Sequence, residues 1–250
     1  MPDPHAGRLE AVIYDVDGTM YRLRAMRARM AWQLAASLVV RPRKTWRAVK
    51  VLRAYRSAQE RLRGPGGMVT PGRQGHGVCM ATQTTRDHGT RPDDPQLRAA
   101  AEALGVPCEA IQPIVEEWMH RRPLRILRRC RRDVVLEAIR MLHGAGVRQA
   151  VYSDYPAQDK LAALGVAGCF DAIVWSAQAE VGQYKPSPEG FLRAAELLGV
   201  APRRCAYVGD RADVDGAGAR AAGMRYIDVT ELKTPQSLTR RVECAIPHRA

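Results

Sequence analysis

Two aspartates separated by one residue, Asp15 and Asp17, follow an apolar run from Ala11 to Tyr14 and precede Gly18. A short apolar run that ends at a chain-breaking residue is typical of a buried strand in a parallel sheet. Ligands of open α/β sheets bind at the carboxyl ends of the strands, so we expect both carboxylates to lie in a crevice. Such a pair needs a cation or a proton to balance its charge. The pattern indicates a chemical site, although an Asp-x-Asp alone is equally compatible with a strand end that caps a helix.

Three later segments place further polar side chains after apolar runs: VYSD at 151–154, GQYKPSP at 182–188 and VGDRADVD at 208–215. Together with DVDGT at 15–19, these four motifs, in this order and at this spacing, resemble the haloacid dehalogenase-like (HAD) superfamily of phosphohydrolases. The resemblance covers residues 8–20 and about 130–230 but not the middle of the chain. It points to the phosphatase and phosphoglucomutase-like branch, which has a helical cap inserted after the first strand.

The resemblance implies a role for each motif. Asp15 is then the nucleophile, which attacks phosphorus and forms an aspartyl-phosphate. Asp17 is the general acid for the leaving oxygen and afterwards the general base for water. Lys185 offsets the developing negative charge, and Ser153 holds a phosphoryl oxygen. The residues expected to contact the phosphate are Gly18, Thr19, Ser153, Asp154 and Lys185.

The resemblance also implies Mg²⁺, a hard cation that prefers oxygen ligands. The expected ligands are the carboxylates of Asp15 and Asp210 and the backbone carbonyl of Asp17. Asp215 is expected to support the metal through a water molecule or a hydrogen bond. Asp213 is nearer to Asp210 in the sequence, but a helix N-cap is the simpler interpretation of that residue.

The acid at position 17 distinguishes between reactions of this superfamily. A halide ion leaves without a proton, so a dehalogenase needs no acid at this position. The leaving oxygen of a phosphate ester, in contrast, has to be protonated by an acid. The sequence therefore predicts a Mg²⁺-dependent phosphohydrolase that acts on a small phosphorylated metabolite. Two alternatives stay open: a phosphomutase on the same fold, and a non-catalytic protein that binds polyanions through an arginine-rich cap.

An α/β framework must position these residues. The first strand is expected at about 9–16, and the later strands at 148–153, 172–175, 205–208 and 225–229. The helices between and before them are expected at 133–143, 157–164, 188–198 and 213–222. Strands that alternate with helices of this length form parallel sheets with right-handed crossovers. The predicted fold class is α/β, a Rossmann-like (HAD-type) parallel sheet core with an inserted α-helical cap.

The chain between the first two motifs is far longer than one crossover connection needs, so we expect the insertion to form the cap. On this division, residues 1–20 and 130–250 form the core and residues 21–129 form the cap. A Gly- and Pro-rich loop is expected at 64–96, with His76 and His88 as solvated loop residues.

Two helices are expected at the start of the cap. Residues 27–40 carry an apolar stripe through Met30, Leu34 and Leu38. The following segment carries a helical stripe through Trp46, Val49, Leu52 and Tyr55. We expect residues 27–56 to pack onto other cap helices rather than to lie in a membrane interface.

The formal net charge of +13 is concentrated in the cap and its connection to the core. Between Tyr21 and Arg63 there are 13 basic residues and one acid, Glu60, and residues 121–132 contain seven arginines and no acid. Solvated helix faces are the simpler interpretation. The alternative is a surface for a polyanion such as nucleic acid, anionic lipid or a phosphorylated substrate.

The cysteines and the apolar segments predict a compartment. None of the six cysteines forms a C-x-x-C pair, which favours reduced thiols over a zinc site or a redox dithiol. The longest nearly apolar run, 30–40, has about half the length that spans a bilayer. The N-terminus lacks the pattern of a secretory signal. We therefore expect a cytoplasmic protein without a membrane span.

Overall fold

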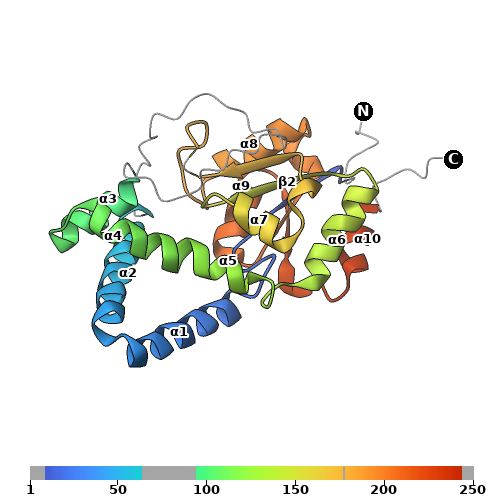
Figure 1. The fold of residues 1–250 in the computed structure, drawn as a ribbon. Helices are drawn as coiled ribbons and strands as arrows, with labels where there is room; N and C mark the ends of the chain where they lie inside the picture. Colours follow the sequence, from blue (N-terminus) through green and yellow to red (C-terminus); the bar gives the residue numbers. More distant parts are fainter. Residues whose placement is uncertain (1–8, 64–93, 177, 244–250) are drawn as a thin grey trace, which may run out of the picture. The chain divides into compact units, whose positions relative to one another are not determined.

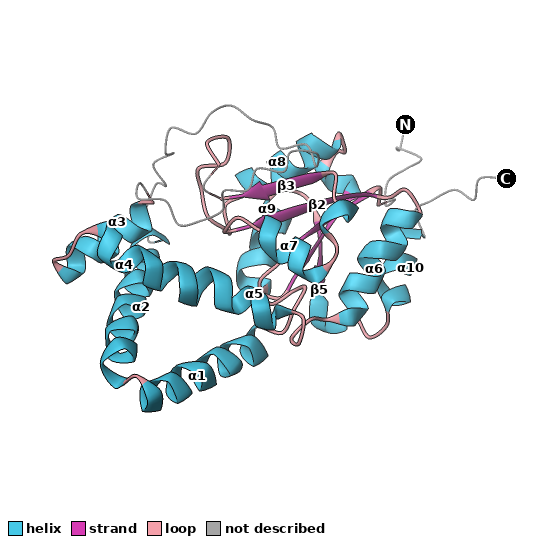
Figure 2. Cartoon of the chain, in the orientation of Figure 1, coloured by secondary structure: helices cyan, strands magenta, loops and turns pink. Residues whose placement is uncertain are grey.

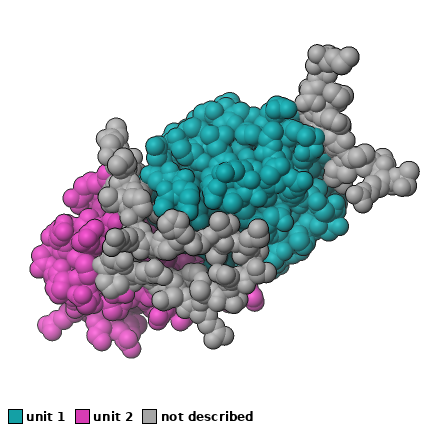
Figure 3. Space-filling view, turned by 90° about the horizontal axis from the view of Figure 1, so that it is seen from above, with its two compact units in different colours: residues 1–22, 76–83, 131–250 teal, residues 23–75, 84–130 magenta. Residues whose placement is uncertain are grey.

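The computed structural model describes residues 9–63, 94–176 and 178–243 (Figure 1). The described residues belong to two compact units, coloured separately in Figure 3. One unit contains residues 9–22 and 131–243, and the other contains residues 23–63 and 94–130. His76, His88 and most of the predicted Gly- and Pro-rich loop lie outside the described residues.

Five parallel strands form the sheet of the first unit, in the order β3-β2-β1-β4-β5 (Figure 2). Their bounds are β1 Ala11–Tyr14, β2 Arg148–Ser153, β3 Ala172–Trp175, β4 Cys205–Gly209 and β5 Arg225–Asp228. The central strand β1 pairs with β2 on one side and with β4 on the other. The predicted Rossmann-like parallel sheet is confirmed, and the carboxyl ends of these three strands meet at one edge.

The apolar runs of the sequence become the strands because they can be buried on both sides. All residues of β1 and β4 are buried. The bounds of β2 and β3 match their predicted ranges, whereas β1 is shorter than the predicted 9–16. Its last ladder contact is the Asp15 N–H, which donates to Val208 O at 2.9 Å, and the chain then turns through residues 17–20.

Helices cover both faces of this sheet (Figure 1). They are α6 Asp133–Gly144, α7 Gln158–Leu164, α8 Glu189–Leu198, α9 Ala217–Ala221 and α10 Pro235–Glu243. Short turns join them: the 3₁₀ turns Ala167–Cys169, Pro202–Arg204 and Val229–Glu231, and the π turn η4 Ala212–Gly216. The predicted helix at 213–222 is therefore two short elements, η4 and α9.

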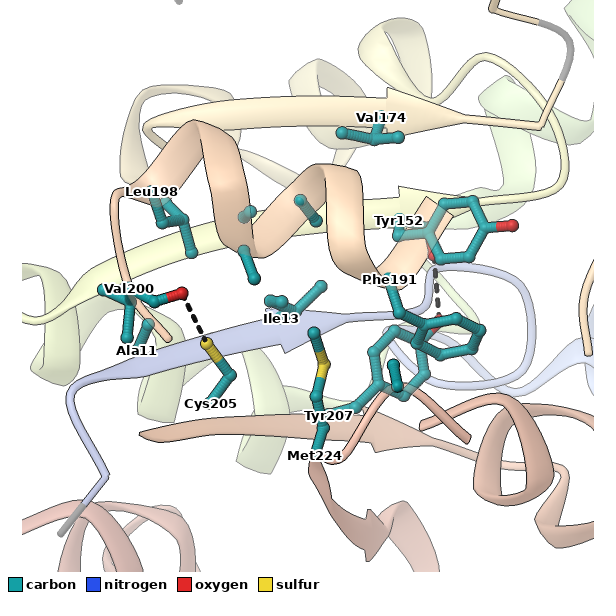
Figure 4. Packing of buried hydrophobic residues seen from close by; sticks show 14 of the residues in the cluster. Ala11, Ile13, Tyr152, Val174, Phe191, Leu198, Val200, Cys205, Tyr207 and Met224 are labelled. Atoms are coloured by element: carbon teal, nitrogen blue, oxygen red, sulfur yellow. Dashed lines mark hydrogen bonds between the residues drawn. The ribbon is translucent and has the colours of Figure 1, made fainter. Parts of the chain in front are cut away.

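Alternate residues of β1 point to opposite faces of the sheet. Ala11 and Ile13 belong to the cluster that packs under α8, drawn in Figure 4. In that cluster the Phe191 ring lies 4.9 Å from the Tyr152 ring and 4.6 Å from the Tyr207 ring, centroid to centroid. Aromatic contacts of this kind fix the strands that carry the neighbouring polar residues.

The second unit is helical in its described part. Its elements are α1 Leu23–Val40, α2 Pro42–Arg63, α3 Pro95–Leu104, α4 Cys108–Val115, the π segment η1 Glu116–Arg121 and α5 Arg122–Leu127. The core of the unit joins α2, α3 and α4 through residues such as Val51, Leu97 and Ile111. No helix in the described part of the chain combines the length and the apolar composition needed to cross a bilayer.

The start of α3 corrects the predicted loop at 64–96. The Asp94 side chain accepts a hydrogen bond from the Gln96 N–H at 2.9 Å, and Pro95 occupies the first helical turn. Both features are typical of a helix start. Residues 94–96 are therefore a capped helix start and not part of a loop.

The apolar stripes predicted for the first two helices are partly wrong. On α2 the buried apolar residues are Ala48, Val51, Tyr55 and Ala58, whereas Trp46 is exposed. On α1 no residue is fully buried, and Leu38 is exposed. Periodicity locates a helix, but the neighbouring helices α3 and α4 decide which side of α2 is covered.

Candidate active site

Asp15 stands directly after the central strand, where its carboxylate is nearly buried. Two neighbours hold the carboxylate in place. The Lys185 ammonium donates to Oδ1 with a separation of 2.7 Å, and the Thr19 hydroxyl donates to Oδ2 at 3.1 Å. Thr19 therefore orients Asp15, and Asp15 keeps a defined position at the carboxyl edge of the sheet.

Three carboxylates from two parts of the sequence meet at this edge. Asp15, Asp210 and Asp215 each offer an oxygen atom, and these oxygens all lie within 4.8 Å of one another. Asp210 follows β4, the neighbour of β1, and Asp215 lies at the end of the π turn η4. The parallel order of β1 and β4 thus brings together residues that are 195 or more positions apart in the chain.

Gly18 makes room for this cluster. Its φ of +99° is rare for any residue with a side chain, and a Cβ at this position would lie 2.1 Å from Asp210 Oδ2. The Arg132 guanidinium donates from Nε to the Gly18 carbonyl at 3.2 Å and holds the turn from the other side. The structure thus gives both a conformational and a steric reason for glycine at this position.

The Lys185 ammonium lies between two of the three carboxylates. It donates to Asp15 Oδ1 and also to Asp215 Oδ1 at 2.9 Å, and its side chain is only 3% exposed. It also lies 5.2 Å from the ring centroids of Tyr152 and Tyr207, which adds cation–π attraction. One lysine thus offsets part of the negative charge of the cluster.

The buried charges shift one another's pKa values. Burial raises the pKa of Asp15 to about 7; the Lys185 cation opposes this rise, and the Asp215 carboxylate adds to it. Burial lowers the pKa of Lys185, but Asp15 together with Tyr207, Asp215 and Asp154 outweighs burial and keeps that pKa well above the usual range. Burial and then Asp215 raise the pKa of Asp210. The lysine is therefore charged, and the raised pKa values of Asp15 and Asp210 indicate that one lysine does not offset both burial and the repulsion among the carboxylates.

The cluster fits a divalent cation in three respects. Its donors are carboxylate oxygens, the ligand type that Mg²⁺ prefers. Asp210 Oδ1 is buried, and no hydrogen-bond partner among the described residues reaches it. Buried polar atoms are nearly always satisfied in folded proteins, so an atom like this one indicates a bound group. Third, Gly18 has no side chain, so the Asp210 carboxylate can lie directly against the turn that follows Asp17.

Asp17 and Asp15 have different partners: Asp17 pairs with Lys160, whereas Asp15 pairs with Lys185. Both of its carboxylate oxygens accept from the Lys160 ammonium, at 2.6 and 2.8 Å, and Oδ1 also accepts from the Tyr21 hydroxyl at 2.5 Å. Burial raises the pKa of Asp17, but the Lys160 cation and these hydrogen bonds outweigh it and lower the pKa. Asp17 is thus held as a carboxylate, and its side chain is not one of the three that gather at Asp210.

Ser153 and Asp154 end β2, the other neighbour of β1. Ser153 is buried, and its hydroxyl oxygen accepts from the Tyr155 N–H at 3.4 Å. Asp154 Oδ1 accepts from the Ser176 hydroxyl at 3.2 Å and from the Lys185 N–H at 3.4 Å. Asp154 therefore anchors the segment that delivers Lys185.

Asp213 corrects a sequence-based expectation. The N-cap of η4 is Arg211, so Asp213 is not a helix cap. Its exposed carboxylate pairs with the Arg211 guanidinium at 3.4 Å. The Arg211 backbone N–H donates to Asp215 Oδ2 at 3.2 Å, which helps to hold Asp215 in the cluster. The structure thus places Asp215, and not Asp213, beside Asp210.

Sequence reasoning missed four residues of the site: Lys160, Tyr21, Tyr152 and Tyr207. Lys160 belongs to α7 and is 143 positions from Asp17, and no motif marks it. Tyr152 in β2 and Tyr207 in β4 look like ordinary core residues in the sequence, because β-strands are rich in aromatic residues. Only the pairing of β1 with β2 and β4 places their rings next to a lysine.

The chain is similar in sequence to known proteins. The haloacid dehalogenase-like hydrolase family matches residues 9–223 of the chain. The glyceraldehyde 3-phosphate phosphatase of Methanopyrus kandleri is 47% identical over 66 residues, which is 26% of this chain and 28% of that protein. The fructose-1-phosphate phosphatase YqaB of Escherichia coli is 34% identical over 116 residues, 46% of this chain and 48% of that protein. The chain spans less than half of the length of these two curated relatives.

A solved structure supports the same fold. The 2-haloacid dehalogenase from Pseudomonas syringae pv. Tomato DC3000 superposes with a TM-score of 0.56 at 20% identity, over 87% of this chain and 85% of that chain. At this level of identity the likeness concerns the fold alone.

Proposed function

The chain belongs to the haloacid dehalogenase-like hydrolases, and from this premise we propose that it hydrolyses phosphate monoesters of small metabolites with the help of Mg²⁺. The observation that carries the proposal is the meeting of Asp15, Asp210 and Asp215, of which Asp15 and Asp215 share the Lys185 ammonium. A phosphate monoester is an anion, so its transfer needs positive charge around the phosphorus and a fixed nucleophile.

In the first step, an Asp15 carboxylate oxygen attacks phosphorus. The new bond joins that oxygen to phosphorus, the bond from phosphorus to the alcohol oxygen breaks, and an aspartyl-phosphate forms. The contacts of Asp15 with Thr19 and Lys185 hold the carboxylate in one orientation. Lys185 also faces the position where negative charge develops, and we assign it to charge stabilisation.

Asp17 is proposed to move the proton in both steps. Its protonated form donates to the leaving alcohol oxygen, which leaves a carboxylate. That carboxylate then takes a proton from water while the water oxygen attacks phosphorus and releases phosphate from Asp15. The Lys160 ion pair stabilises the carboxylate form, which the second step requires, and reduces the fraction of the protonated form that the first step requires.

The proposed residues for Mg²⁺ are Asp15, Asp210, the backbone carbonyl of Asp17 and, in support, Asp215. When bound, the ion would neutralise charge on the phosphoryl oxygens. The unpartnered Asp210 Oδ1 and the close approach of the Asp210 carboxylate to the Gly18 turn support this assignment.

Phosphate contacts are proposed for Ser153 and for the turn that contains Gly18 and Thr19. Ser153 lies at the end of β2, next to the strand that carries Asp15. Asp154 stays in the site as a proposed neighbour of the phosphate, with its anchoring of Lys185 as the better supported role, since a carboxylate repels an anion. We also propose that the helical unit, described over residues 23–63 and 94–130, acts as the cap that selects the substrate.

The four described cysteines that are free, Cys108, Cys130, Cys169 and Cys205, support a reducing compartment. We therefore propose a cytoplasmic location.

The experiment that tests the proposal is the hydrolysis of p-nitrophenyl phosphate by Asp15→Asn. The amide is a poor nucleophile, so turnover with Mg²⁺ should fall by several orders of magnitude. Asp213→Asn is the matched control, because it removes an exposed carboxylate outside the cluster and should leave turnover unchanged. Full activity in Asp15→Asn would refute the assignment.

A phosphomutase uses the same first step and returns the phosphoryl group to a sugar. Incubation with sugar phosphates separates the two reactions. Release of inorganic phosphate supports the phosphatase, whereas an isomerised sugar phosphate without free phosphate would replace it with the mutase.

A further inference from the structure

The second half of α1, residues 30–40, is apolar on two sides and contains no charged residue, whereas the first half carries Arg24, Arg27 and Arg29. Met26, Met30 and Leu34 are half-buried and lie on the side that packs against α2 and α5. The opposite side carries residues spaced at helical intervals that are all exposed: Ala28, Trp32, Ala35, Ala36, Val39 and Val40. A helix that is apolar all round is normally buried in a core or in a membrane. In the described structure, one apolar side of α1 has no such cover.

The exposure is greatest toward the end of α1. Trp32 is 74% exposed, Val39 is 85% exposed and Val40 is 75% exposed. Trp32 and Val39 are seven positions apart, which places them one above the other on the same side of a helix. Large apolar residues gathered in this way mark an interaction surface more often than residues scattered singly.

Cations follow this apolar stripe directly. Arg41 is the one residue between α1 and α2, and Arg43 and Lys44 lie in the first turn of α2. All three are exposed, and with Pro42 they line a shallow depression. No acidic residue occurs between Tyr21 and Gln59, so no neighbour along this stretch neutralises them.

The turn that presents these residues is fixed. The Thr45 side chain is buried, and its hydroxyl oxygen lies 2.9 Å from Ser37 O and 3.0 Å from Arg41 O, within hydrogen-bonding reach of both carbonyls. The Arg41 N–H donates to Ser37 O as well, at 2.8 Å. The apolar end of α1 and the cations of α2 are therefore held together as one surface, here called the tip surface: Trp32, Val39, Val40, Arg41, Arg43 and Lys44.

We propose that the tip surface binds the surface of an anionic lipid bilayer. Apolar side chains would enter the boundary between headgroups and acyl chains, and the arginines and the lysine would pair with lipid phosphates. A tryptophan suits this boundary because its ring is apolar and its N–H is polar. The protein would bind peripherally, since no described helix can cross a bilayer.

Charge alone would equally suit a nucleic acid, but the apolar half of the surface favours lipid. Nucleic-acid backbones offer phosphates to Arg41, Arg43 and Lys44. They offer no apolar layer in which the aliphatic side chains of Val39 and Val40 could be buried. A bilayer surface matches both halves of the tip surface.

The test is flotation of the full-length protein with vesicles of phosphatidylcholine, alone or mixed with phosphatidylglycerol. The protein should float with the mixed vesicles, and high salt should weaken this binding. The triple variant Arg41→Gln/Arg43→Gln/Lys44→Gln should lose on the order of 100-fold in partitioning, because each cation near an anionic surface contributes about fivefold. Trp32→Ser/Val39→Ser/Val40→Ser should lose at least about tenfold.

Matched controls change exposed residues of the same kinds in the other unit. Met141→Ser/Leu192→Ser removes two exposed apolar side chains, and Arg225→Gln/Arg240→Gln removes two exposed cations. Both control variants should bind vesicles nearly as the unchanged protein does. Circular dichroism and thermal unfolding establish that each variant is folded.

Three results would overturn the proposal. The first is equal flotation of tip variants and controls, or equal binding to vesicles with and without phosphatidylglycerol. The second is a change in oligomeric state of the tip variants without lipid, which would assign the surface to a second copy of the chain. The third is binding to single-stranded DNA that needs the cations but is unaffected by the apolar triple variant, without any binding to vesicles.

Discussion

Replacing Gly18 with alanine tests the geometry of the carboxylate cluster. The added Cβ would lie 2.1 Å from Asp210 Oδ2 and 2.5 Å from Asp210 Cγ, whereas real Cβ atoms keep at least 3.0 Å from other heavy atoms. The Asp210 side chain must therefore move from its place in the cluster. The variant thus displaces one of the three proposed carboxylate ligands without changing any charge.

Two measurements distinguish backbone strain from loss of the metal site: the free energy of folding and the affinity for Mg²⁺. Alanine at a positive φ costs about 1–2 kcal/mol of folding free energy. Gly223→Ala is the matched control, because Gly223 has a φ of +75° and its Cβ would meet no atom within 4 Å. Both variants should show this destabilisation. Only Gly18→Ala should also weaken Mg²⁺ binding, by at least about tenfold, since changes in outer-shell partners alone cost that much.

Mg²⁺ titrations provide the assay. Binding to the folded state raises the unfolding temperature with the free Mg²⁺ concentration, so thermal unfolding reports the affinity without any turnover. Activity toward p-nitrophenyl phosphate is measured in parallel. A Gly18→Ala variant that binds Mg²⁺ as tightly as the unchanged protein would refute the reasoning, as would an equal loss of Mg²⁺ binding in Gly223→Ala.

Two further variants address the lysines. In EDTA, Lys185→Met should lower the free energy of unfolding by about 3–5 kcal/mol, because Asp15 and Asp215 lose the partner of a buried ion pair. Mg²⁺ should restore part of this stability while turnover stays low, and unchanged stability in EDTA on denaturant titration would contradict the account. Lys160→Met should raise the pKa of Asp17, because it removes the cation that lowers that pKa. More of the acid is then protonated at a given pH, so the alkaline limb of kcat/KM should move to higher pH; an unchanged pH profile would exclude the proposed role of this ion pair.

The sheet and its motif-bearing edge could be predicted because the relevant signals are local. β2 and β3 match their predicted bounds, since each apolar run is closed by a polar or turn-forming residue. Asp15, Asp210 and Asp215 were expected together from the resemblance, and the order β2-β1-β4 explains how they meet.

Other features depend on contacts that local patterns do not encode. The buried side of α2 begins at Ala48 and not at Trp46, because α3 and α4 decide which side is covered. The Lys160 partner of Asp17 lies on a helix that no motif marks. The uncovered side of α1 was not predicted for a similar reason: the stripe through Met30, Leu34 and Leu38 indicated one packed side, and only the packing of the helix leaves Trp32 and Val39 exposed.

The central claim is that phosphate passes through Asp15, and chemical trapping tests it most directly. The enzyme is mixed with a phosphorylated substrate and Mg²⁺, quenched in acid, reduced with borohydride and mapped by peptide mass spectrometry. Borohydride converts an aspartyl-phosphate to homoserine, so the account predicts homoserine at position 15 and none in a sample without substrate. Homoserine at another aspartate, or rapid turnover that leaves position 15 unmodified under these conditions, would contradict it.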